Sequence, residues 1–353
     1  MRKALSILMF LVLALSFGSG ALAEEQKPAW VRADPASIGD TIVVYATLDD
    51  AQQATVEGIW YKYYPDCRIE WISDSVGKLV ARARGEINNP QADVIMGGLF
   101  ESDGTTYHDV LQPYTPSIKD ELNQLDPYGY YVFFDVQYMA LVVNNDLVKE
   151  LGIEIKGYND LLQPELKGKI IQADPNASSS AYRQFHTMLA VMGDSFGDDK
   201  AWDYLDKLIA NCNGVVTTSS STVFKSVISG EYVVGLSYEN IIQMQIEKNG
   251  ADNITLVYPV EGNTACASGG AMIKDCKRPE AAAAFLDFCS SAEYQQARAD
   301  ENCARGVNRN ITYGNYPPDS SLGLVAIDWE WLGTQKEALL EKWADHWAQF
   351  SGT

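Results

Sequence analysis

The sequence predicts an α/β fold with two lobes. Patterns typical of short strands and amphipathic helices alternate along the chain, and the alternation restarts after a Pro- and Tyr-rich stretch at 113–131. The chain has 353 residues, which is more than one hydrophobic core usually holds, so two domains are expected. Alternating strands and helices favour a largely parallel sheet with helices on both faces.

The first group of elements is organised around three predicted strands. These are short apolar runs at 41–48, 68–73 and 92–98. Between them, Asp50 is expected to cap a helix that Pro65 ends, and Ser75 is expected to cap a second helix.

The alternation restarts after residues 133–145, which are expected to form one or two strands. Further strands are predicted at 168–174, 214–218, 232–238 and 254–260. Serine runs begin two of the intervening helices, which are expected to stop at Gly193 and Gly230. The chain is therefore expected to cross between lobes near 132–142 and again near 260–268.

These crossings set the expected domain boundaries. Lobe 1 combines residues 24–135 with 262–318, and lobe 2 comprises residues 136–261. Residues 319–353 are expected to form two tryptophan-rich amphipathic helices that pack over the lobes.

Residues 1–23 have the layout of a cleaved secretory signal peptide. Arg2 and Lys3 precede an apolar run at 4–17, and small residues lead to Ala23, near which we expect cleavage. No other window is long and apolar enough to span a bilayer. We therefore expect an exported protein of the periplasm.

The formal net charge of −20 constrains the possible partners. A charge of this sign repels nucleic acid and anionic membranes, so neither is expected to bind. It also slows the approach of an anionic ligand. An anion site in this chain would therefore depend on local dipoles.

The six cysteines of an exported chain favour disulfides over a metal site, because no CxxC pair or histidine cluster accompanies them. The sequence leaves the pairing open. We expect one disulfide between Cys266, after the second crossing, and Cys303, which precedes a predicted return strand, "ARGVNRN". Cys212 is expected to be unpaired and buried.

Serines begin three of the predicted helices, at the carboxyl ends of strands where α/β proteins bind ligands. A single serine in such a place is an ordinary N-cap. Two runs of three consecutive serines exceed that need, and the free N–H groups of helix N-termini bind anions. The predicted donors to a phosphate-like group are Ser75, Ser178, Ser179, Ser180, Ser219 and Ser220.

Other residues at strand ends complete the candidate site. Thr47 is a further donor, and Gly97 and Gly98 would let a ligand approach the backbone. Tyr238 ends the strand at 232–238, and Glu239 lies just past it. Glu239 is expected to face the far end of the ligand and to accept from an ammonium or hydroxyl group, with a solvated loop position as the alternative.

Signals for catalysis, cofactors and metals are weak. No histidine has a metal-binding spacing, and "GLSYE" lacks the second glycine of a nucleophile elbow. There is no GxGxxG motif and no P-loop, so neither a cofactor nor an enzyme is expected. His186 is expected to be packed, whereas Lys78 and Arg183 either contact the ligand or lie on solvated helix faces.

Several segments resemble the extracellular solute-binding proteins of ABC importers, over about residues 40–315. They are "GKLVARARGEINNPQADVIMGG", "LKGKIIQADPNASSSAY", "TTSSSTVFKSVISGEYVVGLSYEN" and "YPVEGNTACASGGAMIKDCKRPEAAAAFLDFCSS". The branch they resemble includes ferric-ion, hexose-phosphate and 2-aminoethylphosphonate binders. The resemblance implies the two-lobed periplasmic-binding-protein fold with mixed sheets, strand hinges and a cleft between the lobes. It also implies closure on a ligand and delivery to a permease in the inner membrane. We expect a monomer.

Ferric-ion members of that branch are similar but carry a carboxylate after the strand aligned with "ADVIMG" and a tyrosine pair after "VGLSYEN". This chain has Gly97–Gly98 and Asn240–Ile241 there, which leaves too few anionic oxygens for iron. The leading hypothesis is a periplasmic binding protein for a phosphorylated or phosphonate-bearing organic anion, such as a sugar phosphate or 2-aminoethylphosphonate. A ferric-ion binder with a synergistic anion and an exported hydrolase are the alternatives.

Overall fold

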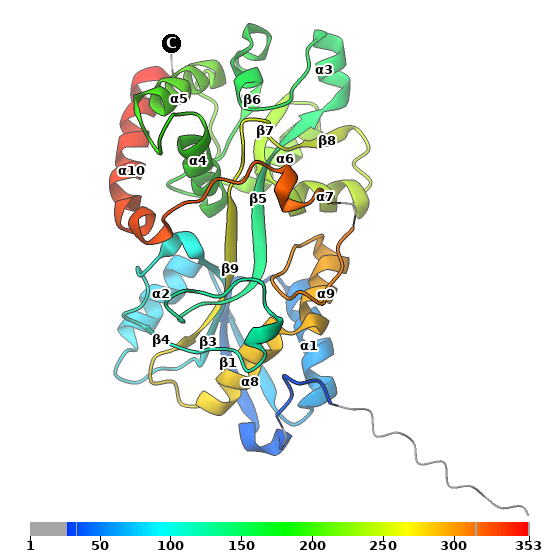
Figure 1. Cartoon of the computed structure of the whole chain (residues 1–353), viewed down its shortest axis with the longest axis vertical. Helices are drawn as coiled ribbons and strands as arrows, with labels where there is room; N and C mark the ends of the chain where they lie inside the picture. The colour runs from blue at the N-terminus through cyan, green and yellow to red at the C-terminus, as the bar shows by residue number, and fades with distance from the viewer. Residues whose placement is uncertain (1–26, 33, 315, 352–353) are drawn as a thin grey trace, which may run out of the picture.

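The computed structural model of the chain describes residues 27–32, 34–314 and 316–351. The predicted signal peptide, with its cleavage site near Ala23, lies outside the described residues. Figure 1 shows two lobes that are joined by long strands.

Strands from both lobes form one mixed sheet. The described strands are β1 (Thr41–Ala46), β2 (Arg68–Ser73), β3 (Val94–Phe100), β4 (Leu111–Gln112), β5 (Val132–Asn144), β6 (Ile170–Ile171), β7 (Val234–Tyr238), β8 (Ile254–Val257) and β9 (Ala265–Ile273). Their order is β2-β1-β3-β9-β5-β7-β6, with β4 beside β9 and β8 beside β5. β1 pairs in parallel with β2 and β3, whereas β5 and β9 pair antiparallel with each of their neighbours.

Helices cover both faces of this sheet. The described α-helices are α1 (Asp50–Tyr63), α2 (Val76–Gly85), α3 (Asn145–Leu151), α4 (Ser179–Val191), α5 (Asp199–Cys212), α6 (Ser220–Ile228), α7 (Glu239–Glu247), α8 (Pro279–Ser290), α9 (Ala292–Asn302) and α10 (Trp329–Phe350). Two 3-10 turns matter below, η2 (Glu101–Asp103) and η6 (Asp319–Ser321).

The two crossing strands β5 and β9 lie side by side in the middle of the sheet, and each reaches from one lobe toward the other (Figure 1). β5 coincides with the first predicted crossing, near 132–142, and β9 overlaps part of the second, near 260–268. The predicted lobe boundaries, 24–135 with 262–318 and 136–261, stay a prediction.

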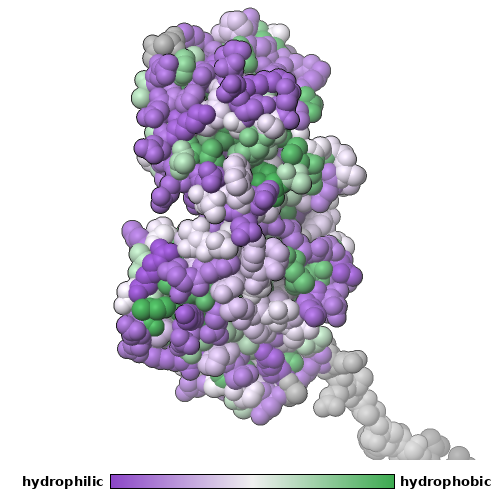
Figure 2. Space-filling view, turned by 60° about the vertical axis from the view of Figure 1, so that its left-hand side comes forward, coloured by the Kyte–Doolittle hydropathy of each residue, from purple (hydrophilic) through white to green (hydrophobic). Residues whose placement is uncertain are grey.

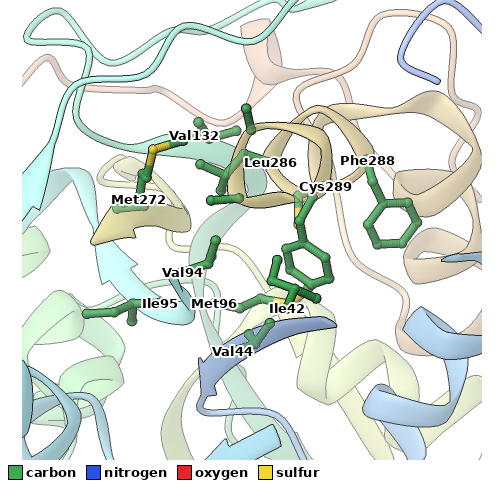
Figure 3. Close-up of a cluster of buried hydrophobic side chains, with 14 of the residues drawn as sticks. Ile42, Val44, Val94, Ile95, Met96, Val132, Met272, Leu286, Phe288 and Cys289 are labelled. Atoms are coloured by element: carbon green, nitrogen blue, oxygen red, sulfur yellow. The ribbon is translucent and has the colours of Figure 1, made fainter. Parts of the chain in front are cut away.

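Each lobe has its own apolar core. In lobe 1, Val44 of β1, Val94 of β3 and Leu286 and Phe288 of α8 belong to one cluster of buried apolar side chains, which Figure 3 shows. In lobe 2, alternate residues of β5 point to opposite faces of the sheet. Leu141 and Val143 join the core under α4 and α5, whereas Ala140 and Val142 join the core under α6 and α7.

Three local predictions differ from the structure. Asp49, and not Asp50, caps α1, because Asp49 and Gln52 form a capping box. Residues 214–218 form no strand and are represented only by the isolated bridge between Ala173 and Thr217. The predicted return strand after Cys303 consists only of isolated bridges, such as that between Val136 and Arg305.

The predicted pair of C-terminal helices is instead one turn, η6, and the single long helix α10. α10 contacts both lobes. Lys336 lies 3.1 Å from Asp103 of η2 in lobe 1, and Trp343 is buried in the core of lobe 2. Among the described residues, no helix combines the length and the apolar character that a membrane span requires.

The predicted disulfide between Cys266 and Cys303 is wrong in this structure. All six cysteines are buried and carry free thiols. Cys266 lies in the strand β9, whereas Cys303 ends α9 and its Sγ lies 3.6 Å from Glu247 of α7. Cys212 is fully buried, as expected, and burial raises the pKa of its thiol to about 12.

Candidate functional site

A cavity of about 760 Å³ lies between elements of the two lobes. Lobe 1 contributes the loop after β1, the start of α2 and the end of β3, and lobe 2 contributes the starts of α4 and α6. The crossing strand β5 lines it as well. Figure 2 shows the surface indented between the lobes, with mostly hydrophilic side chains on both.

Three helices present their N-termini to this cavity. Ser75, Ser178 and Ser219 have the extended backbone of N-cap residues and precede α2, α4 and α6. Only Ser178 uses its hydroxyl as a cap, accepting from the N–H of Ala181 at 3.4 Å. Because the first N–H groups of a helix have no partner within the helix, three sets of donors face one space.

Within each serine run the outer two hydroxyls pair with each other. Ser178 Oγ lies 3.0 Å from Ser180 Oγ, and Ser219 Oγ lies 2.8 Å from Ser221 Oγ. The middle serines, Ser179 and Ser220, also line the cavity. The runs therefore place more hydroxyls at the cavity than N-capping requires.

Two glycines near the end of β3 bring its backbone close to neighbouring segments of lobe 1. Gly97 and Gly98 have positive φ angles of +81° and +73°, and the register of β3 against β9 shifts at this point. A Cβ atom on Gly97 would lie 2.5 Å from Thr47 Oγ1, and one on Gly98 would lie 2.9 Å from Val76 Cβ. Glycine is therefore required here on steric grounds.

Charged side chains from three separate elements form part of the cavity wall. Arg298 of α9 pairs with Asp135 of β5 at 2.9 Å, and both are buried. Arg183 of α4 donates to Gln137 Oε1 at 2.6 Å, and its guanidinium lies 3.7 Å from the centre of the Phe100 ring. Stacking on the ring and this hydrogen bond hold the Arg183 guanidinium in place.

Burial and charge act in opposite directions on the pKa values of this group. Burial lowers the pKa of Arg183. Burial raises the pKa of Asp135, against the opposing effect of Arg298 and Arg183. For Arg298, burial is outweighed by the nearby Asp135 carboxylate, so the pKa is raised. The wall therefore holds two guanidiniums against one carboxylate.

The structure brings nearly all of the predicted site residues together. The residues that line the cavity are Thr47, Ser75, Gly97, Gly98, Ser178, Ser179, Ser180, Ser219, Ser220 and Tyr238. Their contact with a ligand stays a prediction.

Glu239 is the predicted site residue that lies elsewhere. Its carboxylate is buried and accepts from Arg305 at 2.8 and 2.6 Å, and from the Tyr258 hydroxyl at 2.5 Å. Neither the cleft-facing position nor the solvated alternative describes it. The sequence could not indicate this, because the arginine that pairs with it lies 66 residues further along the chain.

The other charged candidates also differ in whether they line the cavity. Arg183 lines the cavity, whereas Lys78 is exposed and pairs with Asp74 at 3.0 Å. His186 is fully buried, and burial together with Arg183 and Lys336 lowers its pKa to about 3. Its imidazole is therefore neutral and packed, as expected.

Sequence reasoning missed Asp135 and Arg298. The sequence could have singled out Asp135 as a candidate, because it is a single charge within the apolar run "VFFDV" of β5. Arg298 had no such signal, since it lies on a polar helix 163 residues away from its partner. Among the described residues, no group of three or more His, Cys, Asp or Glu side chains is arranged to hold a metal ion.

A two-lobed α/β fold with a polar cavity between the lobes defines the class of ligand-capturing binding proteins. Residues 89–319 match the model of the bacterial extracellular solute-binding protein family. The chain belongs to that family, and its relatives support the role of a solute-binding component of an ABC transporter.

Individual relatives agree with this assignment. The chain is 25% identical to AfuA, a periplasmic binding protein from Actinobacillus pleuropneumoniae solved with exogenous fructose-6-phosphate, with a TM-score of 0.74 over 87% of this chain and 98% of that one. It is 25% identical to a probable ABC transporter periplasmic-binding protein of Sinorhizobium fredii, covering 94% of this chain and 91% of that protein. It is 27% identical to the thiamine-binding periplasmic protein of Escherichia coli, covering 66% and 70%.

Proposed function

We propose that this protein captures a small organic anion with a phosphate or phosphonate group in the periplasm and delivers it, as a monomer, to an ABC permease of the inner membrane. The observation that carries the proposal is the convergence of three helix N-termini, with their serines, on one cavity. Helix N-termini and hydroxyls are the donors that phosphate oxygens prefer.

The charge of the cavity wall supports an anion over a cation. The chain carries a formal charge of −20, yet Arg183 and Arg298 line the cavity against Asp135, which is the one carboxylate among the described residues lining it. Lys336 also lines it, with Asp103 as its partner. A cation would meet this positive wall, whereas a phosphate group is attracted by it.

The relatives point in the same direction without deciding the ligand. The AfuA structure was determined with fructose-6-phosphate, and the relative in Sinorhizobium fredii is a probable periplasmic component of an ABC transporter. The thiamine-binding relatives make thiamine a necessary comparison in any binding experiment.

Titration calorimetry on the mature chain tests the proposal directly. The ligands are inorganic phosphate, fructose 6-phosphate, 2-aminoethylphosphonate, thiamine and ferric citrate. We expect at least one phosphate or phosphonate compound to bind with micromolar or better affinity, which corresponds to about 8 kcal/mol. Binding of thiamine or iron alone would contradict the proposal.

The double variant Ser179→Ala/Ser220→Ala tests the serine runs. Each hydroxyl that donates to a charged group contributes about 1.5 to 3 kcal/mol, so we expect the pair to cost about 3 to 6 kcal/mol in binding of every phosphate-bearing ligand. Ser229→Ala is the matched control, because Ser229 caps the opposite end of α6 and donates to Ser226 O at 3.0 Å. Equal effects of the variant and the control would exclude the serine runs as the anion site.

A further inference from the structure

Four polar side chains that line the cavity carry an atom without a hydrogen-bond partner among the described residues. These atoms are Asp135 Oδ1, Arg183 Nε, Arg298 Nε and Tyr182 Oη. The side chains are between 3% and 8% exposed. Because an unpaired buried polar atom costs about 1 to 3 kcal/mol, such a concentration of them at one cavity wall requires an explanation.

The side chains that carry these atoms are held in fixed positions. Asp135 Oδ2 is engaged by Arg298 at 2.9 Å, which leaves Oδ1 as the free acceptor. The Arg298 guanidinium lies 5.1 Å from the centre of the Phe134 ring, and that of Arg183 lies 3.7 Å from the centre of the Phe100 ring. The wall therefore contains one carboxylate acceptor, two arginine donors and a phenol, each with a buried and unpaired polar atom.

We propose that Asp135, Arg183, Arg298 and Tyr182 form a second subsite that binds hydroxyl groups on the body of the ligand. The inference rests on the proposed function, since it assumes that a phosphate or phosphonate group occupies the serine-lined helix N-termini. It assigns the ligand to the polyhydroxylated phosphate esters, and it excludes aminoalkyl and carboxyalkyl compounds as the preferred class.

The hydrogen-bonding capacity of the unpaired atoms favours hydroxyl groups over ammonium and carboxylate groups. A hydroxyl both donates and accepts, so it can donate to Asp135 Oδ1 while it accepts from Arg183 Nε–H or Arg298 Nε–H. An ammonium only donates, and it would meet two guanidiniums with the one lining carboxylate already paired. A carboxylate only accepts, so it could pair with Arg183 or Arg298 but would leave Asp135 Oδ1 without a donor.

The position of Glu239 strengthens the exclusion of an ammonium. The sequence predicts that Glu239 accepts a hydrogen bond from an ammonium or hydroxyl group at the far end of the ligand. Both of its oxygens are instead engaged by Arg305, outside the cavity. No second carboxylate among the described residues lines the cavity to replace it.

A ligand series with the phosphate held constant tests the subsite on the unmodified chain. The hydroxylated probes are fructose 6-phosphate, glucose 6-phosphate and glycerol 3-phosphate, and the matched probes are propyl phosphate, phosphoethanolamine and phosphoglycolate. We expect at least one hydroxylated probe to bind roughly 10-fold or more tightly than each matched probe. If propyl phosphate binds as tightly as every hydroxylated probe, internal water satisfies these atoms and the subsite is overturned.

Two variants test whether Asp135 and Tyr182 produce the preference for hydroxylated probes. Asp135→Asn should weaken the best hydroxylated probe by roughly 10- to 100-fold and leave propyl phosphate within about 3-fold. Tyr182→Phe should weaken the same probe with no loss of folding, because its hydroxyl has no described partner. Asp287→Asn is the matched control, since Asp287 is equally buried and lies 3.4 Å from Arg32, away from the cavity.

The outcomes separate this inference from the proposed function. If phosphate-bearing probes bind but Asp135→Asn and Tyr182→Phe affect propyl phosphate and sugar phosphates equally, the hydroxyl subsite is wrong and the anion site stands. A preference for phosphoethanolamine or phosphoglycolate would also overturn the subsite alone. If no phosphate-bearing probe binds the unmodified chain, the proposed function fails and the subsite fails with it.

Discussion

Single residues at the end of β3 determine how close the backbone comes to the cavity wall. Gly97 and Gly98 both adopt the left-handed region, and both lie where a methyl group would meet the side chain of Thr47. The close approach and the positive φ angle are separate requirements. A substitution can distinguish them.

Gly98→Ala should destabilise the protein by more than the left-handed conformation alone explains. That conformation costs a residue with a side chain about 1 to 2 kcal/mol, and the new methyl group would also lie 2.9 Å from Val76 Cβ and Thr47 Cγ2. Gly152→Ala is the control, because Gly152 has a similar φ of +68° with nothing within 4 Å. Urea unfolding should show the larger loss of unfolding free energy for Gly98→Ala. Equal losses would mean that the side chains of Thr47 and Val76 move aside without a cost in stability.

Glu239 changes from a predicted ligand contact to a structural residue. We expect Glu239→Gln to lower the free energy of unfolding by about 3 to 5 kcal/mol, because it leaves the Arg305 guanidinium buried without its carboxylate. Binding of the ligand should change little. Asp319→Asn removes the exposed carboxylate 3.2 Å from the same arginine and should cost far less. A large loss of affinity in a stable Glu239→Gln protein would contradict this assignment.

At the scale of elements, the turn η2 connects β3 to the rest of lobe 1 and carries a perturbed carboxyl group. Glu101 accepts from Gln124 at 2.8 Å, and burial raises its pKa from 4.5 to about 7. The folded state therefore binds this proton more tightly than the unfolded state. The stability that this proton contributes is present at low pH and is lost as the pH rises from about 4.5 to about 7.

Glu101→Gln should remove that pH dependence. Each pKa unit corresponds to about 1.4 kcal/mol, so the variant should gain at most about 3 kcal/mol over the unmodified chain at pH 8 and nothing near pH 4. The measurement is the free energy of unfolding at both pH values. Glu165→Gln, at an exposed glutamate, is the control. Parallel pH profiles for Glu101→Gln and the unmodified chain would show that this carboxyl group does not titrate in that range.

At the scale of the whole molecule, the cavity is divided between two lobes that β5 and β9 connect (Figure 1). Donors at the start of α2 lie in lobe 1, and those at the starts of α4 and α6 lie in lobe 2. A ligand that contacts both sets draws the lobes together. α10 contacts both lobes as well, through Lys336 and Trp343.

We therefore expect the radius of gyration to decrease when the ligand binds. Small-angle scattering with and without a saturating phosphate-bearing ligand measures this change. The Ser179→Ala/Ser220→Ala variant at the same ligand concentration should keep the dimensions of the free protein. Unchanged scattering from the unmodified chain at saturation would mean that the lobes do not move.

The sequence by itself determined the features that depend on neighbouring residues. The alternation of strands and helices, the serine starts of α4 and α6 and the glycines at the end of β3 follow from periodicity, capping and backbone preference, which act over a few residues. These local signals were sufficient to predict an α/β fold and the part of the cavity wall that serines and glycines line. They were insufficient for 214–218, where the apolar run "GVVTT" is strand-like but only one bridge forms.

Only the tertiary structure decided which charges meet. Asp135 pairs with Arg298 across 163 residues, and Glu239 pairs with Arg305 across 66, so one carboxylate enters the cavity wall and the other is withdrawn from it. The same holds for Cys266 and Cys303, whose thiols remain free. The physical reason is that a buried charge must find its partner wherever the chain packs, and packing depends on the whole chain and not on the sequence nearby.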